Sequence, residues 1–281
     1  MLFPENIGKK LSIDEVSLSK GELYTFVTNK KGGSKKGTIV ACVKGTRSND
    51  ILKILEKLPL KARKQVDEVT LDMAKNIELA TKLAFPESTL VTDRFHVVKL
   101  VTEALQHERI QLRWKELDKE NKAIAEAKKQ GLKHKPKQLS NGDTPKQLLA
   151  RSRYIIAKKP HQWTDNQKQR AKLLFKLYPQ LETAYKHTLE FRNSYELTDK
   201  LMARERFEKW IKETYENELK SFYTAANTVN ANFDNILNFF NNRNTNANAE
   251  SFNAKIKLFR ANLRGVTDTT FFLFRLNKLF A

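Results

Sequence analysis

The sequence contains a single cysteine, Cys42, in 281 residues, which excludes a disulfide framework and a zinc site built from cysteine pairs. Cys42 lies in the apolar run 37–43, where a buried core thiol is commoner than a nucleophile. Glycine and proline are scarce, with 9 and 7 copies, whereas phenylalanine occurs 17 times, so the composition is that of a folded chain. No apolar run approaches the roughly 20 residues of a membrane helix, and the N-terminus has no secretory pattern. We therefore expect a cytoplasmic protein without a membrane partner.

Acidic residues are also in the minority. The chain has 32 Asp and Glu against 52 Lys and Arg, which gives a formal net charge of +20. Such an excess concentrates polyanions around a protein, and nucleic acid is the commonest of them. An anionic membrane surface is the alternative, but it usually requires a basic amphipathic helix or an anchor. The charge therefore predicts a nucleic-acid partner.

The first hundred residues alternate between strand and helix patterns. β-Branched and apolar runs predict strands over 11–18, 23–28, 38–43, 66–73 and 89–92. Helical spacing predicts a helix over 51–58, capped by Ser48 or Asn49, and another over 74–85. Three strands followed by helix, strand, helix and strand indicate an α/β layer that begins with a hairpin meander.

From residue 95 to about 230 the pattern is helical and highly charged. A long helix is expected over 95–130, followed by a basic loop at 133–137. Further helices are expected to begin after caps at Thr144, Thr164 and Thr198-Asp199. The tryptophans lie at helical spacing among apolar neighbours, which favours core packing for Trp114, Trp163 and Trp210. This segment is predicted to be an all-helical insertion or second domain.

An asparagine-rich segment, 241–248, is expected to be a loop that ends in the N-cap of another helix. At 100° per residue, this helix has an apolar stripe made of Phe252, Ile256, Phe259 and Leu263. Its polar stripe consists of Glu250, Asn253, Lys257, Arg260 and Arg264. The helix therefore carries an acid at its start and cations along the rest of its polar face.

Three acids occupy unusual positions. Asp14 lies inside an apolar strand and Asp72 at the end of another, where an unpaired carboxylate costs desolvation free energy. Adjacent strand ends could bring both together with Glu250, to hold two Mg²⁺ ions for phosphoryl transfer. Structural explanations remain open at this point: a lysine partner for Asp14, a helix cap for Asp72, and a favourable helix N-terminus for Glu250.

Four blocks of this sequence resemble signature blocks of bacterial insertion-sequence transposases of the ISL type (third family), especially the ISAon branch. They are Ser-Ile-Asp-Glu-Val at 12–16, Thr-Leu-Asp-Met at 70–73, Thr-Asp-Arg-Phe-His at 92–96, and Ala-Glu-Ser-Phe-Asn-Ala-Lys-Ile-Lys at 249–257. The resemblance implies a ribonuclease H-like core, a mixed five-stranded sheet with flanking helices, interrupted by a large all-helical insertion. It also implies a metal-binding Asp-Asp-Glu triad at Asp14, Asp72 and Glu250. We expect the core over 1–100, the insertion over 101–235, and a return to the core over 236–281.

The function expected from this resemblance is that of a DNA transposase catalytic subunit, active as a homodimer. Two Mg²⁺ or Mn²⁺ ions would support phosphodiester hydrolysis at the element ends and strand transfer by the 3′ hydroxyl. Longer relatives carry an N-terminal zinc-ribbon and helix-turn-helix region, so a companion protein is expected to supply it unless this copy is an immobile remnant. The alternatives are a ribonuclease H-like nuclease without strand transfer and a non-catalytic DNA-binding remnant.

Two further groups are candidates at the site. Asp93 and His96 could brace the metal site or position the scissile strand, or they could simply be the N-cap of the long helix and a first-turn residue bonded to it. The cations Lys255, Lys257, Arg260 and Arg264 follow Glu250, and we expect them to contact phosphates without reading base sequence. Double-stranded DNA is thus the expected partner, and the nucleoid the expected place within the cytoplasm.

Overall fold

The computed structural model describes residues 1–19, 21–243 and 247–281. The chain divides into two compact units, which are described here one at a time. The first unit comprises Met1–Val97 and Ala231–Ala281, and the second comprises Val98–Asn230. Across the described residues, no helix combines the length and the apolar character needed to span a membrane.

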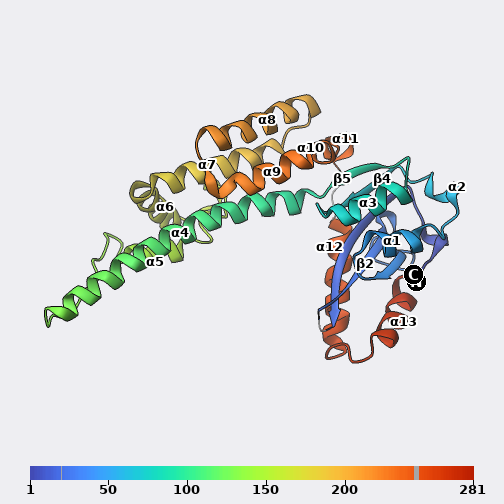
Figure 1. Cartoon of the computed structure of the whole chain (residues 1–281), viewed down its shortest axis with the longest axis horizontal. Helices are drawn as coiled ribbons and strands as arrows, with labels where there is room; N and C mark the ends of the chain where they lie inside the picture. The colour runs from blue at the N-terminus through green and yellow to red at the C-terminus, as the bar shows by residue number, and fades with distance from the viewer. Residues whose placement is uncertain (20, 244–246) are drawn as a thin grey trace. The chain divides into compact units, whose positions relative to one another are not determined.

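The first unit is built on a mixed five-stranded sheet with the strand order β3-β2-β1-β4-β5 (Figure 1). The strands are β1 (Lys10–Ser19), β2 (Glu22–Asn29), β3 (Ile39–Lys44), β4 (Glu68–Leu71) and β5 (Thr89–Thr92). β2 pairs antiparallel with β1 and β3, and β4 pairs in parallel with β1 and β5. The predicted α/β fold with a hairpin meander at its start is confirmed.

The largest difference from the predicted strands is at 66–73, where β4 is only Glu68–Leu71. Val66 closes a turn instead, because its backbone N–H donates to the carbonyl of Arg63. At the other end, Asp72 Oδ1 accepts a hydrogen bond from the backbone N–H of Ala74 at 2.9 Å. This bond turns the chain out of the strand, so that Asp72 lies just beyond it.

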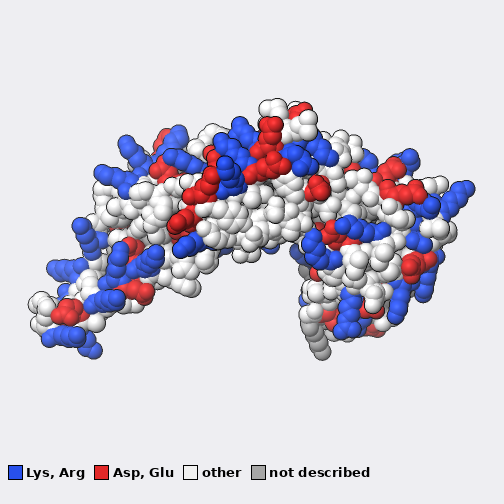
Figure 2. Space-filling model, turned by 45° about the horizontal axis from the view of Figure 1, so that its top comes forward, with Lys and Arg blue, Asp and Glu red and all other residues white. Residues whose placement is uncertain are grey.

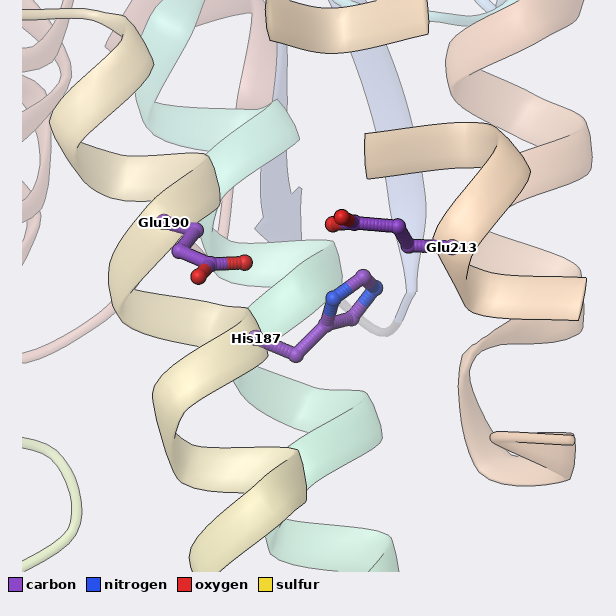
Figure 3. Close-up of side chains that lie close together, drawn as sticks. All are labelled: His187, Glu190 and Glu213. Carbon is purple, nitrogen blue, oxygen red and sulfur yellow. The ribbon is translucent and has the colours of Figure 1, made fainter. Parts of the chain in front are cut away.

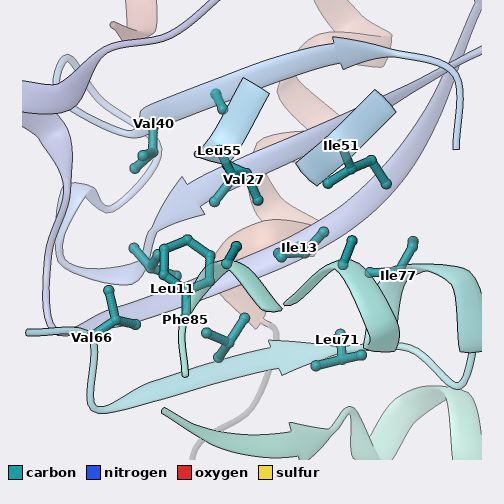
Figure 4. Packing of buried hydrophobic residues seen from close by; sticks show 14 of the residues in the cluster. Leu11, Ile13, Val27, Val40, Ile51, Leu55, Val66, Leu71, Ile77 and Phe85 are labelled. Carbon is teal, nitrogen blue, oxygen red and sulfur yellow. The ribbon is translucent and has the colours of Figure 1, made fainter. Parts of the chain in front are cut away.

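One face of the sheet is covered by α1 (Ser48–Leu55) and α3 (Lys75–Ala84), with the short α2 (Leu60–Arg63) between them in sequence. Figure 4 shows the apolar cluster on this face, which includes Leu11, Ile13, Val27, Val40, Ile51, Leu55, Leu71, Ile77 and Phe85. The predicted cap of α1 at Ser48 or Asn49 is wrong, because the helix already begins at Ser48. Arg47 takes the N-cap position without a side-chain bond.

The opposite face is covered by α12 (Ala247–Asn262) and α13 (Thr269–Phe280). Side chains alternate along β1, so Val16 and Leu18 face these helices whereas Leu11 and Ile13 face the other way. Phe252 of α12 packs edge-to-face on Phe26, with ring centroids 5.8 Å apart. The second cluster consists of Val16, Leu18, Tyr24, Phe26, Ile39, Cys42, Phe252, Ile256, Phe272, Leu273 and Leu276.

Cys42 belongs to this second cluster and is buried. Burial raises the pKa of its thiol to about 12. Because the thiolate is the nucleophilic form, this cysteine is unreactive at neutral pH, and its predicted core role is confirmed.

Helix α12 differs in detail from its prediction. Part of the expected asparagine loop, 244–246, lies outside the described residues, and Asn241 and Asn242 belong to α11 (Phe239–Asn242), which follows α10 (Phe233–Leu237). Leu263 and Arg264 were expected on the stripes of α12, but the helix ends at Asn262. The backbone N–H of Gly265 bonds back to the carbonyl of Arg260, and Arg264 turns the chain with φ 55°. Leu263 is therefore exposed.

The described part of the second unit contains only helices and their connections, as predicted. They are α4 (Arg94–Lys129), which begins in the first unit, α5 (Pro145–Arg151), α6 (Asp165–Leu177), α7 (Pro179–Ser194), α8 (Lys200–Glu216) and α9 (Tyr223–Ala231), with single 3₁₀ turns between some of them. Three of the predicted starts are confirmed. Thr144 and Thr164 precede α5 and α6, and Asp199 caps α8 by accepting from the N–H of Met202 at 2.8 Å.

The three tryptophans of this unit differ in how far they are buried. Trp210 is buried and stacks on His187, and Trp163 stacks on Tyr185 and donates from Nε1 to the carbonyl of Ile155. Trp114 was predicted to be in the core, but it is 57% exposed. It follows the buried Leu112 by two positions, which places it about 200° around α4 and therefore on the opposite face.

Candidate active site

The parallel strands bring three of the predicted acids to one end of the sheet. Ser12 of β1 pairs with Thr70 of β4, so Asp14 and Asp72 each lie two residues beyond that pair. Leu71 of β4 pairs with Thr92 of β5, so Asp72 and Asp93 each follow the paired position. Because strands β1, β4 and β5 run in the same direction, Asp72 and Asp93 at the carboxyl ends of β4 and β5 lie beside Asp14 in the middle of the longer β1.

Asp14 is half-buried on the sheet face that α12 covers. Its Oδ2 accepts a hydrogen bond of 2.6 Å from Asn253 Nδ2, and its Oδ1 accepts one of 2.8 Å from the backbone N–H of Glu15. Burial raises the pKa of Asp14, and the nearby charge of Asp72 raises it further, against the lowering effects of Glu15 N–H, His96 and Asn253. A lysine partner for Asp14, the structural alternative, is not among its contacts with the described residues.

Glu250 lies in the first turn of α12 and is exposed. Desolvation raises its pKa, and the charges of Asp93 and Asp14 raise it further, whereas His96 lowers it. These interactions place Glu250 in the electrostatic field of the acids on the sheet. The pKa of Glu15 is also raised, by burial and then by Asp72 and Asp14. The charges of Asp14 and Asp72 therefore act on Glu15, although alternation along β1 places its side chain on the opposite face of the sheet from Asp14.

Asp93 and His96 form a bonded pair beside the acids. His96 Nδ1 lies 2.9 Å from Asp93 Oδ2, and the pair is buried at Asp93 and 30% exposed at the imidazole. The hydrogen bond from His96 to Asp93 raises the pKa of His96, and the charges of Asp14 and Asp72 add to the effect while burial opposes it. Asp93 Oδ1 also accepts a 3.4 Å bond from the N–H of Phe95 in the first turn of α4. Asp93 and His96 are therefore consistent with both interpretations, since Asp93 accepts a bond at the start of α4 and the pair lies near the acids.

The carboxylates of Asp14, Asp72 and Glu250 are farther apart than the ligands of a single metal ion. Within the described part of the chain, one trio of His, Cys, Asp or Glu has its ligand atoms within 4.8 Å of one another, and it is His187, Glu190 and Glu213. Asp14, Asp72 and Glu250 do not form such a trio. The donor set nevertheless suits Mg²⁺ or Mn²⁺, which take carboxylate oxygens and keep water or substrate oxygens as further ligands.

The predicted DNA-binding cations lie in different settings. Lys257 is exposed on α12, seven residues after Glu250 and thus within about 20° of the same stripe. Arg260 Nη1 reaches the carbonyl of Ser17 at 3.5 Å, and Lys255 Nζ donates to the carbonyl of Ser34 at 2.7 Å. Arg264 lies beyond the helix. On the face drawn in Figure 2, Lys and Arg are scattered among acids, with stretches of uncharged surface between them.

Two polar contacts of the first unit were not foreseen. Asn253 was placed on the polar stripe with Glu250, but its bond to Asp14 joins positions 239 residues apart in sequence. A buried ion pair, Lys30 Nζ to Glu68 Oε1 at 3.0 Å, lies at the amino ends of β1 and β4, where Lys10 pairs with Glu68. Lys30 also bonds to the hydroxyl of Thr70, and burial lowers the pKa of Lys30. Of these residues, only Asn253 could have been selected from the sequence, because it follows Glu250 by three positions and shares its helix face.

Comparison with known protein families matches residues 11–276 to the DDE_Tnp_ISL3 family, which is described as transposase. Searches among curated proteins and among solved structures gave no match. The matched range includes Asp14, Asp72 and the helix that carries Glu250. It covers most of the chain and agrees with the mixed sheet, the flanking helices and the helical unit described above. The chain therefore belongs to the ISL3 family of DDE transposases, which act on DNA.

Proposed function

We propose that Asp14, Asp72 and Glu250 form the catalytic triad of a transposase that cuts DNA at the ends of a mobile element and joins the freed 3′ hydroxyl to target DNA. The observation that carries this proposal is the register of the parallel strands, which aligns Asp14 with Asp72. Glu250 is supported as the third acid by its place in the first turn of α12 and by its pKa, which desolvation and then the charges of Asp93 and Asp14 raise.

Two Mg²⁺ or Mn²⁺ ions fit this donor set better than one, because the triad carboxylates are not all within 4.8 Å of one another. A pair of ions roughly 3.5–4 Å apart spans a wider set of ligands than one ion does. When bound, such ions activate water as a nucleophile and stabilise charge on the attacking and leaving oxygens. Asp14, Asp72 and Glu250 would hold them.

The other residues of the site orient these acids and the substrate. Asn253 and the N–H of Glu15 fix both oxygens of Asp14, and the N–H of Ala74 holds Asp72. His96 donates to Asp93 through Nδ1, which leaves Nε2 free to face a phosphate oxygen. In its protonated form, which the raised pKa favours, the imidazole also offsets part of the repulsion among the acids.

Lys257 and Arg260 would contact phosphates that flank the scissile one, with Lys255 and Arg264 as further contacts. Such contacts position DNA without reading its sequence. We further propose that residues 101–235 are an insertion in the catalytic core, that two copies act together on two element ends, and that a companion protein supplies end recognition.

The experiment that tests the proposal is cleavage and strand transfer on labelled element-end DNA with Mg²⁺, with and without the companion protein. We expect cleaved ends and joined products that require all three acids. Cleavage without joined products would indicate a nuclease on the same fold. DNA binding without any cleavage, under every metal and partner condition, would contradict the proposal and indicate a non-catalytic remnant.

A further inference from the structure

A second cluster of metal-ligating side chains lies in the helical unit, separate from the acids of the sheet. His187 and Glu190 come from α7 and Glu213 comes from α8, and one ligand atom of each lies within 4.8 Å of the others. Figure 3 shows the imidazole and the two carboxylates pointing toward one another across the gap between these helices. This arrangement is independent of the proposed catalytic function.

The hydrogen bonds of His187 determine which ring nitrogen is free. His187 Nε2 lies 2.7 Å from the hydroxyl of Thr214, and that hydroxyl donates its proton to the carbonyl of Trp210 at 2.9 Å. Nε2 must therefore carry the proton and donate. Nδ1 is then the unprotonated nitrogen, and its lone pair can bind a metal ion.

The imidazole is held rigidly, with only 4% of the residue exposed. It stacks on Trp210 with centroids 4.7 Å apart and an interplanar angle of 13°, and the edge of Phe222 covers it from another side. Burial lowers the pKa of His187 to about 4. A neutral imidazole can bind a metal without first losing a proton.

The carboxylates of Glu190 and Glu213 can move toward a bound ion. Glu190 is exposed, and the side chain of Glu213 has a single ion pair in the described structure, at 3.5 Å to the mostly exposed Lys209. Such an exposed pair stabilises little and is easily displaced. A hollow of about 30 Å³ is lined by the two glutamates together with Ser194, Arg206, Lys209 and Trp210, and it is large enough to hold a water molecule next to these carboxylates. His187 does not line it.

We propose that His187 Nδ1, Glu190 and Glu213 bind one divalent transition-metal ion, with Zn²⁺ the best fit, and that the ion fastens α7 to α8. A neutral imidazole with two carboxylates suits Zn²⁺ better than Mg²⁺, which prefers oxygen ligands alone. Bond lengths of about 2.0–2.2 Å in a tetrahedral site place ligand atoms roughly 3.4 Å apart. Rotation of the two flexible glutamates closes the remaining gap, and water completes the coordination.

The test is Zn²⁺ titration of the full chain carrying Asp14→Asn and Glu250→Gln, so that the acids of the sheet do not contribute. We expect one equivalent of Zn²⁺ to bind, the melting temperature to rise, and the ¹⁵N resonance of His187 Nδ1 to shift. Adding Glu190→Gln and Glu213→Gln should weaken binding at least about 10-fold, since loss of even an outer-shell partner costs about 10–100-fold.

The matched control adds Glu182→Gln and Glu216→Gln, which remove two charges from the same helices and break the ion pairs to Lys186 and Lys212. This variant should bind Zn²⁺ as tightly as its parent. Equal Zn²⁺ binding by the Glu190/Glu213 variant and this control would overturn the proposal, as would a His187 Nδ1 resonance that stays unchanged at saturation. Both variants leave His187 in place, so neither result depends on removing a buried ring.

Discussion

Asn253 Nδ2 lies 2.6 Å from Asp14 Oδ2, and this bond joins helix α12 to the central strand β1. It ties the helix that carries Glu250 to the strand that carries Asp14. It also stabilises the ionised form of Asp14 against the desolvation that raises its pKa. Asn253 is thus a positioning residue for the proposed triad.

Replacing Asn253 by Ala removes a donor to a carboxylate, so the pKa of Asp14 should rise further. The acidic limb of the pH–rate profile for DNA cleavage should then move to higher pH, because Asp14 must be ionised to act. The control is Asn262→Ala at the exposed end of the same helix. An unchanged acidic limb in Asn253→Ala would show that the bond does not tune Asp14.

Asp14→Asn, Asp72→Asn and Glu250→Gln should each reduce Mg²⁺-dependent cleavage at least about 10²–10³-fold while the chain stays folded. Burial raises the pKa of Asp14 and Glu250, so their ionised forms destabilise the fold as pH rises through those raised values. At neutral pH without metal, Asp14→Asn and Glu250→Gln should therefore melt at the same or a higher temperature. Near-normal cleavage by one variant would remove that residue from the triad, and loss of folding would favour a structural role.

Lys257→Ala with Arg260→Ala should weaken DNA binding and slow cleavage at low DNA concentration. If each cation neutralises one phosphate, the slope of log K against log salt should become shallower by about 1.8, at about 0.9 per phosphate. The matched control is Lys53→Ala with Lys57→Ala, which are exposed on or beside α1 on the other face of the sheet. An equal salt slope in the two double variants would leave DNA guidance to other cations.

His96 should make the stability of the fold depend on pH. Its pKa is raised above 6.5 in the folded state, chiefly by the bond to Asp93. The stabilisation is therefore complete below the unfolded value and is lost as pH rises through the raised folded value. The melting-temperature difference between the wild type and His96→Gln should be larger at pH 6 than at pH 9. A difference that does not vary with pH would mean that the imidazole is not charged in the fold.

The sequence predicted the parts of the fold that local patterns determine. The continuous apolar run at 38–43 predicted a strand buried on both faces, and its residues divide between the two core clusters. The stripe of Phe252 and Ile256 followed from helical spacing and lies in the second cluster. The end of α12 was missed, because a turn at Arg264 depends on backbone geometry that spacing does not specify. Trp114 was misplaced because apolar neighbours in sequence need not share a helix face.

The site was predictable only in part, for a different reason. Asp14 stands out in the sequence because it is an acid inside an apolar strand, and the family resemblance identified Asp72 and Glu250 as its partners. The pairing of Ser12 with Thr70 depends on the path of the whole chain between β1 and β4, which local sequence patterns do not specify. The same holds for the buried pair of Lys30 and Glu68, 38 residues apart, since neither position departs from an ordinary pattern.

The sheet face covered by α12 and α13 has a consequence for synthesis of the protein. All five strands are complete at Thr92, but α12 does not begin until Ala247. A ribosome adding about 5–20 residues per second needs roughly 10–30 s to make the chain in between. During that interval Val16, Leu18, Tyr24 and Phe26 face water without their helical cover. The nascent chain then lacks Glu250 and exposes apolar side chains that favour aggregation, so we expect it to depend on chaperones until α12 and α13 have left the ribosome.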